Sequence, residues 1–191
     1  MTPEHGEILL RLARAAIGAA LERPRLGVDN APWLREPGAS FVTLMRHGEL
    51  RGCIGSLEPY RPLREDVEDN ARMAAFRDPR FPALTSRDYA SIEVEVAVLS
   101  ALTPVDLNDE DDALAQLRPG IDGIVFQYRH HRSTFLPQVW EHLPEPREFL
   151  AHLKKKAGLP ADFWDPLVSL SRYTVYKWRE RDLAAPRGRT S

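Results

Sequence analysis

The sequence predicts an α+β protein with an antiparallel β-sheet flanked by helices. Three observations support this class: an apolar repeat at helical spacing near the N-terminus, a turn at His47-Gly48 between two segments rich in β-formers, and alternation of side-chain type from Ile92 to Leu99. Because the strands fall into hairpins with helices interspersed, antiparallel pairing is favoured.

The first element is a helix that begins at Thr2-Pro3, since proline is well tolerated at the first helical position. Apolar residues follow at helical spacing from Ile8 to Leu21, and Pro24 ends the helix. Residues 25–38 contain prolines and show no periodicity, so we expect a loop there.

A β-hairpin and a second helix follow. Ser40 to Met45 and Glu49 to Ile54 are predicted as strands that pair around the His47-Gly48 turn. The second helix runs from Pro62 to Phe76, and the rigid segment Asp78 to Pro82 stops it.

The chain beyond Leu99 is predicted to alternate short helices with strands. We expect helices at Asp109–Leu117 and Pro146–Lys156, and strands at Gly123–Tyr128, Ser133–Leu136 and Leu167–Trp178. The acidic block Asp109 to Asp112 lacks the spacing of an EF-hand, so we interpret it as a helix start near the positive end of the helix dipole.

Size and composition restrict the class of protein. The chain has 191 residues, which suits one domain, and we expect residues 1–180 to form it and residues 181–191 to be a flexible tail. Lys and Arg number 26 against 28 Asp and Glu, so no sequence-wide charge favours nucleic acid or a membrane surface. One cysteine excludes an internal disulfide, and no apolar run suits a signal peptide or a membrane span, so we expect a cytoplasmic protein.

The most informative short segment is Leu50 to Gly55. Gly52 and Gly55 allow unusual backbone angles and a close approach to the backbone. If the segment is a strand, Arg51 and Cys53 share a face, and a neighbouring guanidinium stabilises a thiolate. The alternative is that Cys53 is a small buried apolar residue. A nucleophile also needs a base, for which His47, His130 and His131 are the candidates.

Two carboxylates share one face of the strand Ile92 to Leu99. Glu93 and Glu95 are two residues apart, which places them about 6.5–7 Å apart along the strand. Such a pair can serve as general acid and base, or can form salt bridges on a wet face of a sheet.

Polar residues elsewhere give weaker candidates. Asp78 is a candidate for capping a turn and Arg80 for binding an anion, whereas the prolines around them fit a structural role. Thr134 and Gln138 either hydrogen-bond a ligand or satisfy buried backbone groups. The sequence contains none of the motifs GxxxxGK[ST], GxGxxG, GxSxG and HExxH, which argues against the common nucleotide-binding, serine-hydrolase and zinc-protease classes.

Taken together, several segments resemble the AmmeMemoRadiSam system protein A family, which has an AMMECR-type domain. The resemblance covers about residues 5 to 178 in order. The matching segments are Leu50 to Gly55, Asn70-Ala71, Ala74 to Phe76, Asp78 to Pro82, Ile92 to Val96, Gly123-Ile124, Thr134 to Val139 and Lys156 to Leu159. One departure is Asp122-Gly123, where relatives often carry His-Gly.

The resemblance implies an α+β fold of two sublobes with a cleft between them, close to the Cys53 segment. It also implies an association with a Memo-type protein and a radical-SAM protein, without a settled reaction or cofactor. The residues carried over as site candidates are Arg51, Cys53, Asp78, Arg80, Glu93, Thr134 and Gln138, with Gly52 and Gly55 meeting backbone requirements. No metal ligand is among them.

Two functions follow as expectations. The first is an enzyme or enzyme component acting on a small molecule or a modified side chain, with Arg51 holding an anionic group, Cys53 as nucleophile or proton donor and Glu93 as acid or base. The alternative is a non-catalytic adaptor that docks a Memo-type or radical-SAM partner and exposes an apolar patch near Trp140 or Trp178. The charge balance disfavours a nucleic-acid accessory role.

Overall fold

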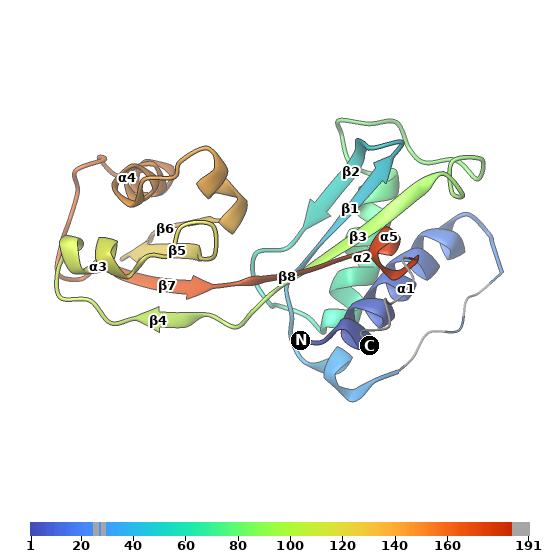
Figure 1. Ribbon diagram of the computed structural model, residues 1–191, viewed down its shortest axis with the longest axis horizontal. Coiled ribbons are helices and arrows are strands. Elements are labelled where there is room, and N and C mark those ends of the chain that lie inside the picture. Colours follow the sequence, from blue (N-terminus) through green and yellow to red (C-terminus); the bar gives the residue numbers. More distant parts are fainter. Residues whose placement is uncertain (25–26, 28–29, 185–191) are drawn as a thin grey trace, which may run out of the picture. The chain divides into compact units, whose positions relative to one another are not determined.

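The computed structural model divides the chain into two compact units (Figure 1). The structure describes residues 1–24, 27 and 30–184. The larger unit comprises Met1–Leu99 with the C-terminal segment from Tyr176, and the smaller unit comprises Ser100–Val175. The α+β class with antiparallel pairing is confirmed, and the strands form two separate four-stranded sheets, one in each unit.

The larger unit is a sheet with helices packed on one face. Its strands lie in the order β2-β1-β3-β8, so β2 is an edge strand and β1 is central. The elements are α1 (Pro3–Ala20), η1 (Pro32–Arg35), β1 (Ser40–Arg46), β2 (Glu49–Gly55), α2 (Leu63–Phe76), β3 (Ile92–Leu99), β8 (Val175–Arg179) and α5 (Glu180–Ala184). Apolar side chains from α1, α2, β1 and β3 form one continuous core.

The hairpin of β1 and β2 follows the sequence prediction. His47 and Gly48 have φ angles of 52° and 85°, which a two-residue turn between right-twisted strands requires. Arg46 then pairs with Glu49, and Val42 and Leu44 are fully buried against the helices. Because strand side chains alternate, Thr43 lies on the opposite face of the sheet.

A buried carboxylate joins α2 to both strands of this hairpin. Asp66 accepts hydrogen bonds from the backbone N–H and hydroxyl of Ser40 at 2.8 and 2.6 Å. It also accepts from Ser56 at 2.7 Å, from Arg61 at 3.0 Å and from Asn70 at 2.9 Å. The Asp66 side chain is 0% exposed, so these donors replace the water that the carboxylate loses on folding.

The smaller unit is a second sheet in the order β4-β7-β5-β6. Its elements are β4 (Thr103–Val105), α3 (Glu110–Gln116), β5 (Gly123–Tyr128), β6 (His131–Phe135), η2 (Pro137–Glu141), α4 (Pro146–Lys156) and β7 (Ser169–Tyr173). Trp140 stacks on Phe149 with ring centroids 3.7 Å apart in a separate apolar core. Asp109 caps α3 by accepting from the backbone N–H of Asp112 at 2.8 Å, which agrees with a helix start.

Three sequence predictions differ from the structure. The single strand expected from Leu167 to Trp178 is two strands, β7 and β8, and they belong to different sheets. The loop expected at 25–38 contains η1, while residues 25–26 and 28–29 lie outside the described residues. Residues 181–184, expected in a tail, belong to α5, and residues 185–191 lie outside the described part.

Two further expectations concern the units and the membrane. The two sublobes implied by the resemblance match the two units, whereas the cleft stays a prediction. Among the described residues, no helix combines the length and the apolar character needed to cross a bilayer.

Replacing Asp66 by Asn should lower the free energy of unfolding by about 3 kcal/mol, because an amide cannot accept from all the donors that surround the carboxylate. Asp69→Asn is the matched control, since Asp69 pairs with the same Arg61 but its side chain is 43% exposed. The control should lose less than about 1 kcal/mol. Urea unfolding followed by circular dichroism measures the free energy of unfolding of both variants. Equal losses would contradict the role of Asp66 in holding α2 against the hairpin.

Candidate functional site

Cys53 lies on the edge strand β2 with its side chain half-buried. It is opposite Thr43 in the register of β1, and the Sγ atom lies 3.1 Å from the Thr43 hydroxyl oxygen. Either atom can be the donor of this hydrogen bond. Thr43 thus orients the thiol on the face of the sheet opposite α1 and α2. No sequence motif singled out Thr43.

The outer edge of β2 is closed by Asp78 and Arg80. The backbone N–H of Cys53 donates to Asp78 Oδ2 at 2.9 Å, and Arg80 Nη2 donates to the backbone carbonyl of Cys53 at 3.2 Å. Arg80 also donates to Asp78, with Nη2 at 2.7 Å from Oδ2 and Nε at 3.0 Å from Oδ1. The ion pair therefore takes the place of the missing neighbouring strand at this residue.

Electrostatics favour the ionised form of Asp78. The hydrogen bonds from the Arg80 guanidinium hold the pKa of the carboxyl well below its usual range, and the backbone N–H groups of Cys53 and Arg80 act in the same direction. Asp78 is 4% exposed, so its charge depends on these donors rather than on water.

Both glycines of the cysteine segment are explained by close approach. A Cβ atom at Gly52 would lie 2.1 Å from the carbonyl oxygen of Ala74 in α2, and one at Gly55 would lie 2.2 Å from the Phe41 ring. The expectation of unusual backbone angles is wrong here, because the positive φ angles belong to other glycines, such as Gly48 and Gly120. Tight packing of β2 against α2 and β1 is the requirement.

Arg51 does not occupy the position beside the thiol that the sequence predicted. The register shifts between Leu44 and Met45 of β1, which pair with Gly52 and Leu50 and leave Arg51 as an extra residue of β2. This β-bulge breaks the alternation on which the prediction rested. Arg51 Nη2 instead donates to the carbonyl of Pro82 at 2.6 Å. The guanidinium that interacts electrostatically with the Cys53 side chain belongs to Arg80.

Glu93 and Glu95 both form ion pairs on β3. Glu95 contacts Lys177 at 3.1 Å and Arg179 at 2.6 Å, and Glu93 contacts Arg181 at 3.4 Å. These contacts match the salt-bridged alternative and attach the C-terminal strand to the sheet. Glu95 pairs with Thr43 in the register, so Cys53, Thr43 and Glu95 form one cross-strand row, and Glu93 lies in a different row, opposite Met45.

Thr134 and Gln138 belong to the smaller unit, whereas Cys53 and Glu93 belong to the larger. The hydroxyl of Thr134 is 3.0 Å from that of Tyr173, whose pKa is raised by burial. Tyr173 in turn donates to the carbonyl of Phe135 at 3.1 Å. Gln138 is exposed on η2.

The carboxylate of Asp122 is already bound within the smaller unit. It is fully buried and accepts from Arg118 Nη2 at 2.5 Å and from the backbone N–H of Arg118 at 3.1 Å. Arg172 lies 3.8 Å from the other oxygen. These contacts give Asp122 a structural role in the smaller unit.

The candidate bases are not partners of the thiol. His47 is exposed in the β1–β2 turn, and His131 shares a hydrogen bond of 2.8 Å with the carbonyl of Ala157. His130 lies against the His131 ring, with centroids 4.2 Å apart. Within the part of the chain that the structure describes, Thr43 is the side chain hydrogen-bonded to the Cys53 thiol.

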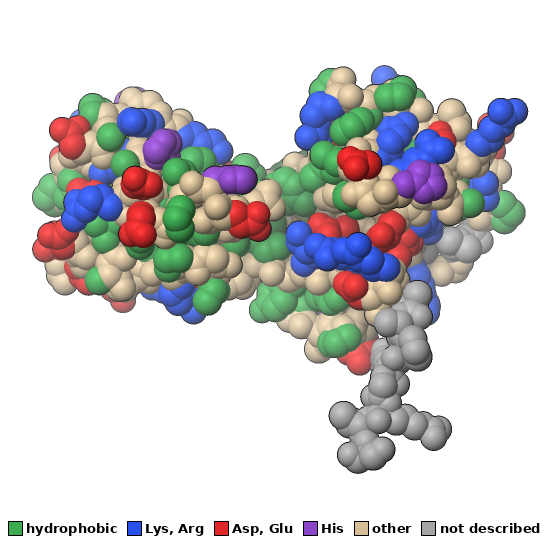
Figure 2. All heavy atoms as spheres, turned by 45° about the horizontal axis from the view of Figure 1, so that its top comes forward, with side chains coloured by type: hydrophobic (Ala, Val, Ile, Leu, Met, Phe, Trp, Pro, Cys, Tyr) green, Lys and Arg blue, Asp and Glu red, His purple; other side chains and the backbone are tan. Residues whose placement is uncertain are grey.

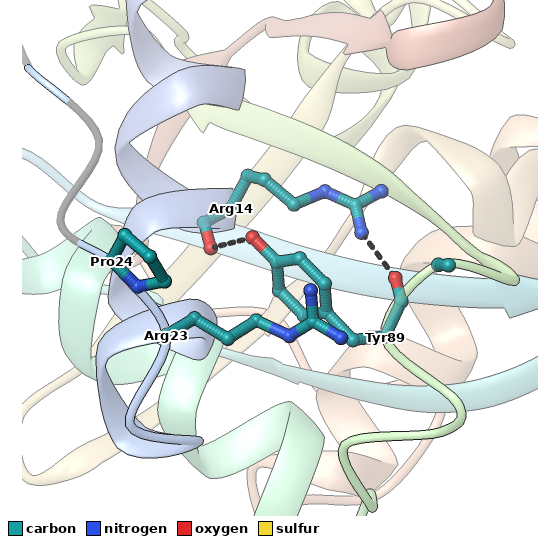
Figure 3. Close-up of a pocket in the computed structure, with 5 residues that line it drawn as sticks. Arg14, Arg23, Pro24 and Tyr89 are labelled. Carbon is teal, nitrogen blue, oxygen red and sulfur yellow. Dashed lines mark hydrogen bonds between the residues drawn. The ribbon is translucent and has the colours of Figure 1, made fainter.

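A pocket of about 500 Å³ lies elsewhere in the larger unit, and no sequence pattern predicted it. It is lined by Arg14, Arg23, Pro24, Tyr89 and Ala90 (Figure 3). The guanidinium carbons of Arg14 and Arg23 lie 5.0 and 4.3 Å from the centroid of Tyr89. Arg14 is committed to Glu180 and to the carbonyls of Tyr89 and Ile92, so it acts mainly as a structural cation.

Comparisons with known proteins agree on one family. The AMMECR1 family profile matches residues 10–178. A protein of Methanocaldococcus jannaschii is 39% identical over 168 residues, which covers 86% of this chain and 84% of the relative. A protein of Thermofilum pendens is 37% identical over 182 residues, with the same coverage of 86% and 84%.

A solved structure has the same fold. The crystal structure of an uncharacterized protein from Pyrococcus horikoshii superposes with a TM-score of 0.75 at 33% identity. The match covers 94% of this chain and 93% of that chain.

Gly52→Ala should destabilise the protein by about 3 kcal/mol, because the added methyl group meets backbone in α2 that cannot move aside alone. Gly27→Ala is the control, since a Cβ there meets nothing within 4 Å. The control should change the free energy of unfolding by less than about 0.5 kcal/mol. Thermal unfolding of both variants measures the difference, and a neutral Gly52→Ala would refute close packing as the reason for this glycine.

Asp78→Asn should cost about 2 kcal/mol at pH 7 and much less near pH 2. The folded pKa of Asp78 is depressed, so its ionised form adds stability above the unfolded pKa of about 3.9, and this stability is lost as pH falls below it. Chemical unfolding of wild type and variant from pH 2 to 7 measures the difference. Asp111→Asn, on a side chain that is 85% exposed, is the control. A pH-independent difference would count against the ionised Asp78.

Proposed function

The chain belongs to the AMMECR1 family, and we propose that it is an enzyme or enzyme component that acts through the Cys53 thiol on a small molecule or a modified side chain. The supporting observation is that Cys53 is fixed at its N–H, its C=O and its Sγ, by Asp78, Arg80 and Thr43. A half-buried thiol held in this way is preorganised for contact with a ligand.

The geometry assigns the neighbouring groups distinct roles in this proposal. Thr43 orients the sulfur through a hydrogen bond in which either atom can be the donor. Glu95 lies across Thr43 in the same row, which favours it over Glu93 as the carboxylate nearer to a ligand. Because Glu95 is paired with Lys177 and Arg179, its role is charge balance and positioning, and Cys53 remains the nucleophile or proton donor.

The resemblance to the AmmeMemoRadiSam system supports a place for this chain beside a Memo-type protein and a radical-SAM protein. In this proposal the Cys53 site works on a molecule that one of those partners supplies or consumes. The association rests on the resemblance alone. In this proposal the Cys53 region is where such a molecule would bind.

A second candidate is a non-catalytic adaptor for the same partners. It is favoured by two exposed side chains in the segment after β2, Leu57 at 44% and Tyr60 at 68%. The prediction of an exposed apolar patch at Trp140 is wrong, since Trp140 is 3% exposed. Trp178 packs over Gly6, where a Cβ would lie 2.2 Å from the indole ring. A docking surface would therefore use the segment after β2.

Iodoacetamide should alkylate Cys53 in the folded protein without denaturant, because the thiol is half-exposed. Thr43→Val should slow this reaction by about threefold to tenfold, since a hydrogen bond from the hydroxyl stabilises the reactive sulfur by about 1 kcal/mol. Mass spectrometry measures the rate, and the single cysteine leaves no competing thiol.

Thr85→Val is the control for the alkylation experiment, because the Thr85 hydroxyl bonds Asp88 rather than Cys53. Its alkylation rate should equal that of wild type. Labelling that appears only after denaturation would reject the enzyme proposal and leave the adaptor as the function to pursue.

A further inference from the structure

Two arginines lie near the ring of Phe81. The guanidinium carbon of Arg80 lies 5.4 Å from the centroid of the ring, and that of Arg51 lies 6.0 Å from it. Arg80 also contacts the carbonyl of Cys53. Arg80 therefore borders Cys53, and Arg51 lies near the same aromatic ring as Arg80.

The ion pair between Arg80 and Asp78 is oriented with its positive end toward solvent. The Arg80 side chain is 53% exposed, whereas that of Asp78 is 2% exposed. A ligand that approaches from solvent meets the guanidinium. The carboxylate lies behind it and exposes almost none of its negative charge at the surface. Arg80 Nη1 has no hydrogen-bond partner among the described residues, because Nε and Nη2 make the contacts to Asp78 and Cys53.

Arg51 supplies a second positive charge near this ring. Its Nη2 donates to the uncharged carbonyl of Pro82, and it makes no salt bridge with any residue that the structure describes. The nearby Asp88 interacts electrostatically with Arg51, but its oxygens are bound by Arg46 at 2.8 Å and by the Thr85 hydroxyl at 2.7 Å.

The neighbouring segments carry further charged residues. Arg46, Arg77 and Arg87 stand on β1 and in the segments around Asp78, whereas Asp88 pairs with Arg46 and Glu49 lies at the hairpin end. Figure 2 shows several Lys and Arg side chains on the upper part of the larger unit, which carries β1 and β2 in Figure 1. The near-neutral composition of the whole chain hides this local excess of positive charge.

We propose that the ligand of the Cys53 site carries an anionic group, a carboxylate or a phosphate, which Arg80 binds beside the thiol and to which Arg51, near the same Phe81 ring, adds a second cation. Arginine suits such a group because its planar guanidinium donates parallel hydrogen bonds to two oxygens. The inference rests on the proposed function, since it names the chemical class of the molecule that the site takes.

Two alkylating probes of similar size test the inference on the full chain. Iodoacetate is anionic and iodoacetamide is neutral, so the ratio of their rate constants at Cys53 reports the local potential. The ratio in the folded protein should exceed the ratio in the denatured protein by about fivefold, and the excess should decline as NaCl is added. An equal ratio in both states would overturn the inference while leaving the reactive thiol of the proposed function intact.

Arg51→Gln should reduce this excess about twofold or more. Arg11→Gln is the control, because it removes the same charge from α1, where Arg11 pairs with Glu7. An Arg51→Gln ratio that equals the wild-type ratio would remove Arg51 from the site.

A second measurement does not depend on thiol reactivity. Inorganic phosphate is titrated at constant ionic strength into protein labelled with ¹⁵N, and the Nε–Hε signals of arginines are followed by NMR. The signals of Arg51 and Arg80 should shift saturably, and that of Arg11 should not. If Cys53 resists both alkylating agents but these signals saturate, the anion site stands and the thiol chemistry fails. If Arg51 and Arg80 respond no more than Arg11, the anion site fails.

Discussion

The ion pair between Asp78 and Arg80 is the constraint on which the Cys53 region depends. An edge strand exposes backbone groups that need partners, and at Cys53 both groups are bound by the two members of this pair. The pair leaves the strand end closed to another chain and fixes the backbone from which the thiol projects. Since Asp78 is buried, loss of Arg80 would leave an unpaired charge inside the protein.

The same pair gives the site its polarity. Its negative end is buried and its positive end faces solvent. The same ion pair therefore binds the free backbone groups of the edge strand at Cys53 and places a cation beside the thiol. Arg51 adds a second cation, which a bulge in β2 directs toward Pro82 and Phe81 instead of toward Cys53. A protein with balanced composition can in this way present a local anion-binding surface, because distribution rather than net charge sets the local potential.

The charged residues of β3 have a different purpose. Glu93 and Glu95 pair with cations from β8 and α5, and Glu180 bonds both Arg14 and the backbone N–H of Val94. These contacts attach the C-terminal segment to a sheet formed mostly by the first half of the chain. The two carboxylates that the sequence offered as an acid and a base therefore serve mainly to hold that segment on the sheet through ion pairs.

Local sequence determined most elements, because helical periodicity, strand alternation, glycine turns and proline breaks act over a few residues. The α1, α2, β1, β2 and β3 elements and the His47-Gly48 turn were all predictable in this way. Tertiary structure alone decided the division into two sheets, the exchange of Arg51 for Arg80 beside the thiol, and the pairing of Thr43 with Cys53. The physical reason is that register, bulges and edge closure depend on contacts between segments far apart in sequence, which no local pattern encodes.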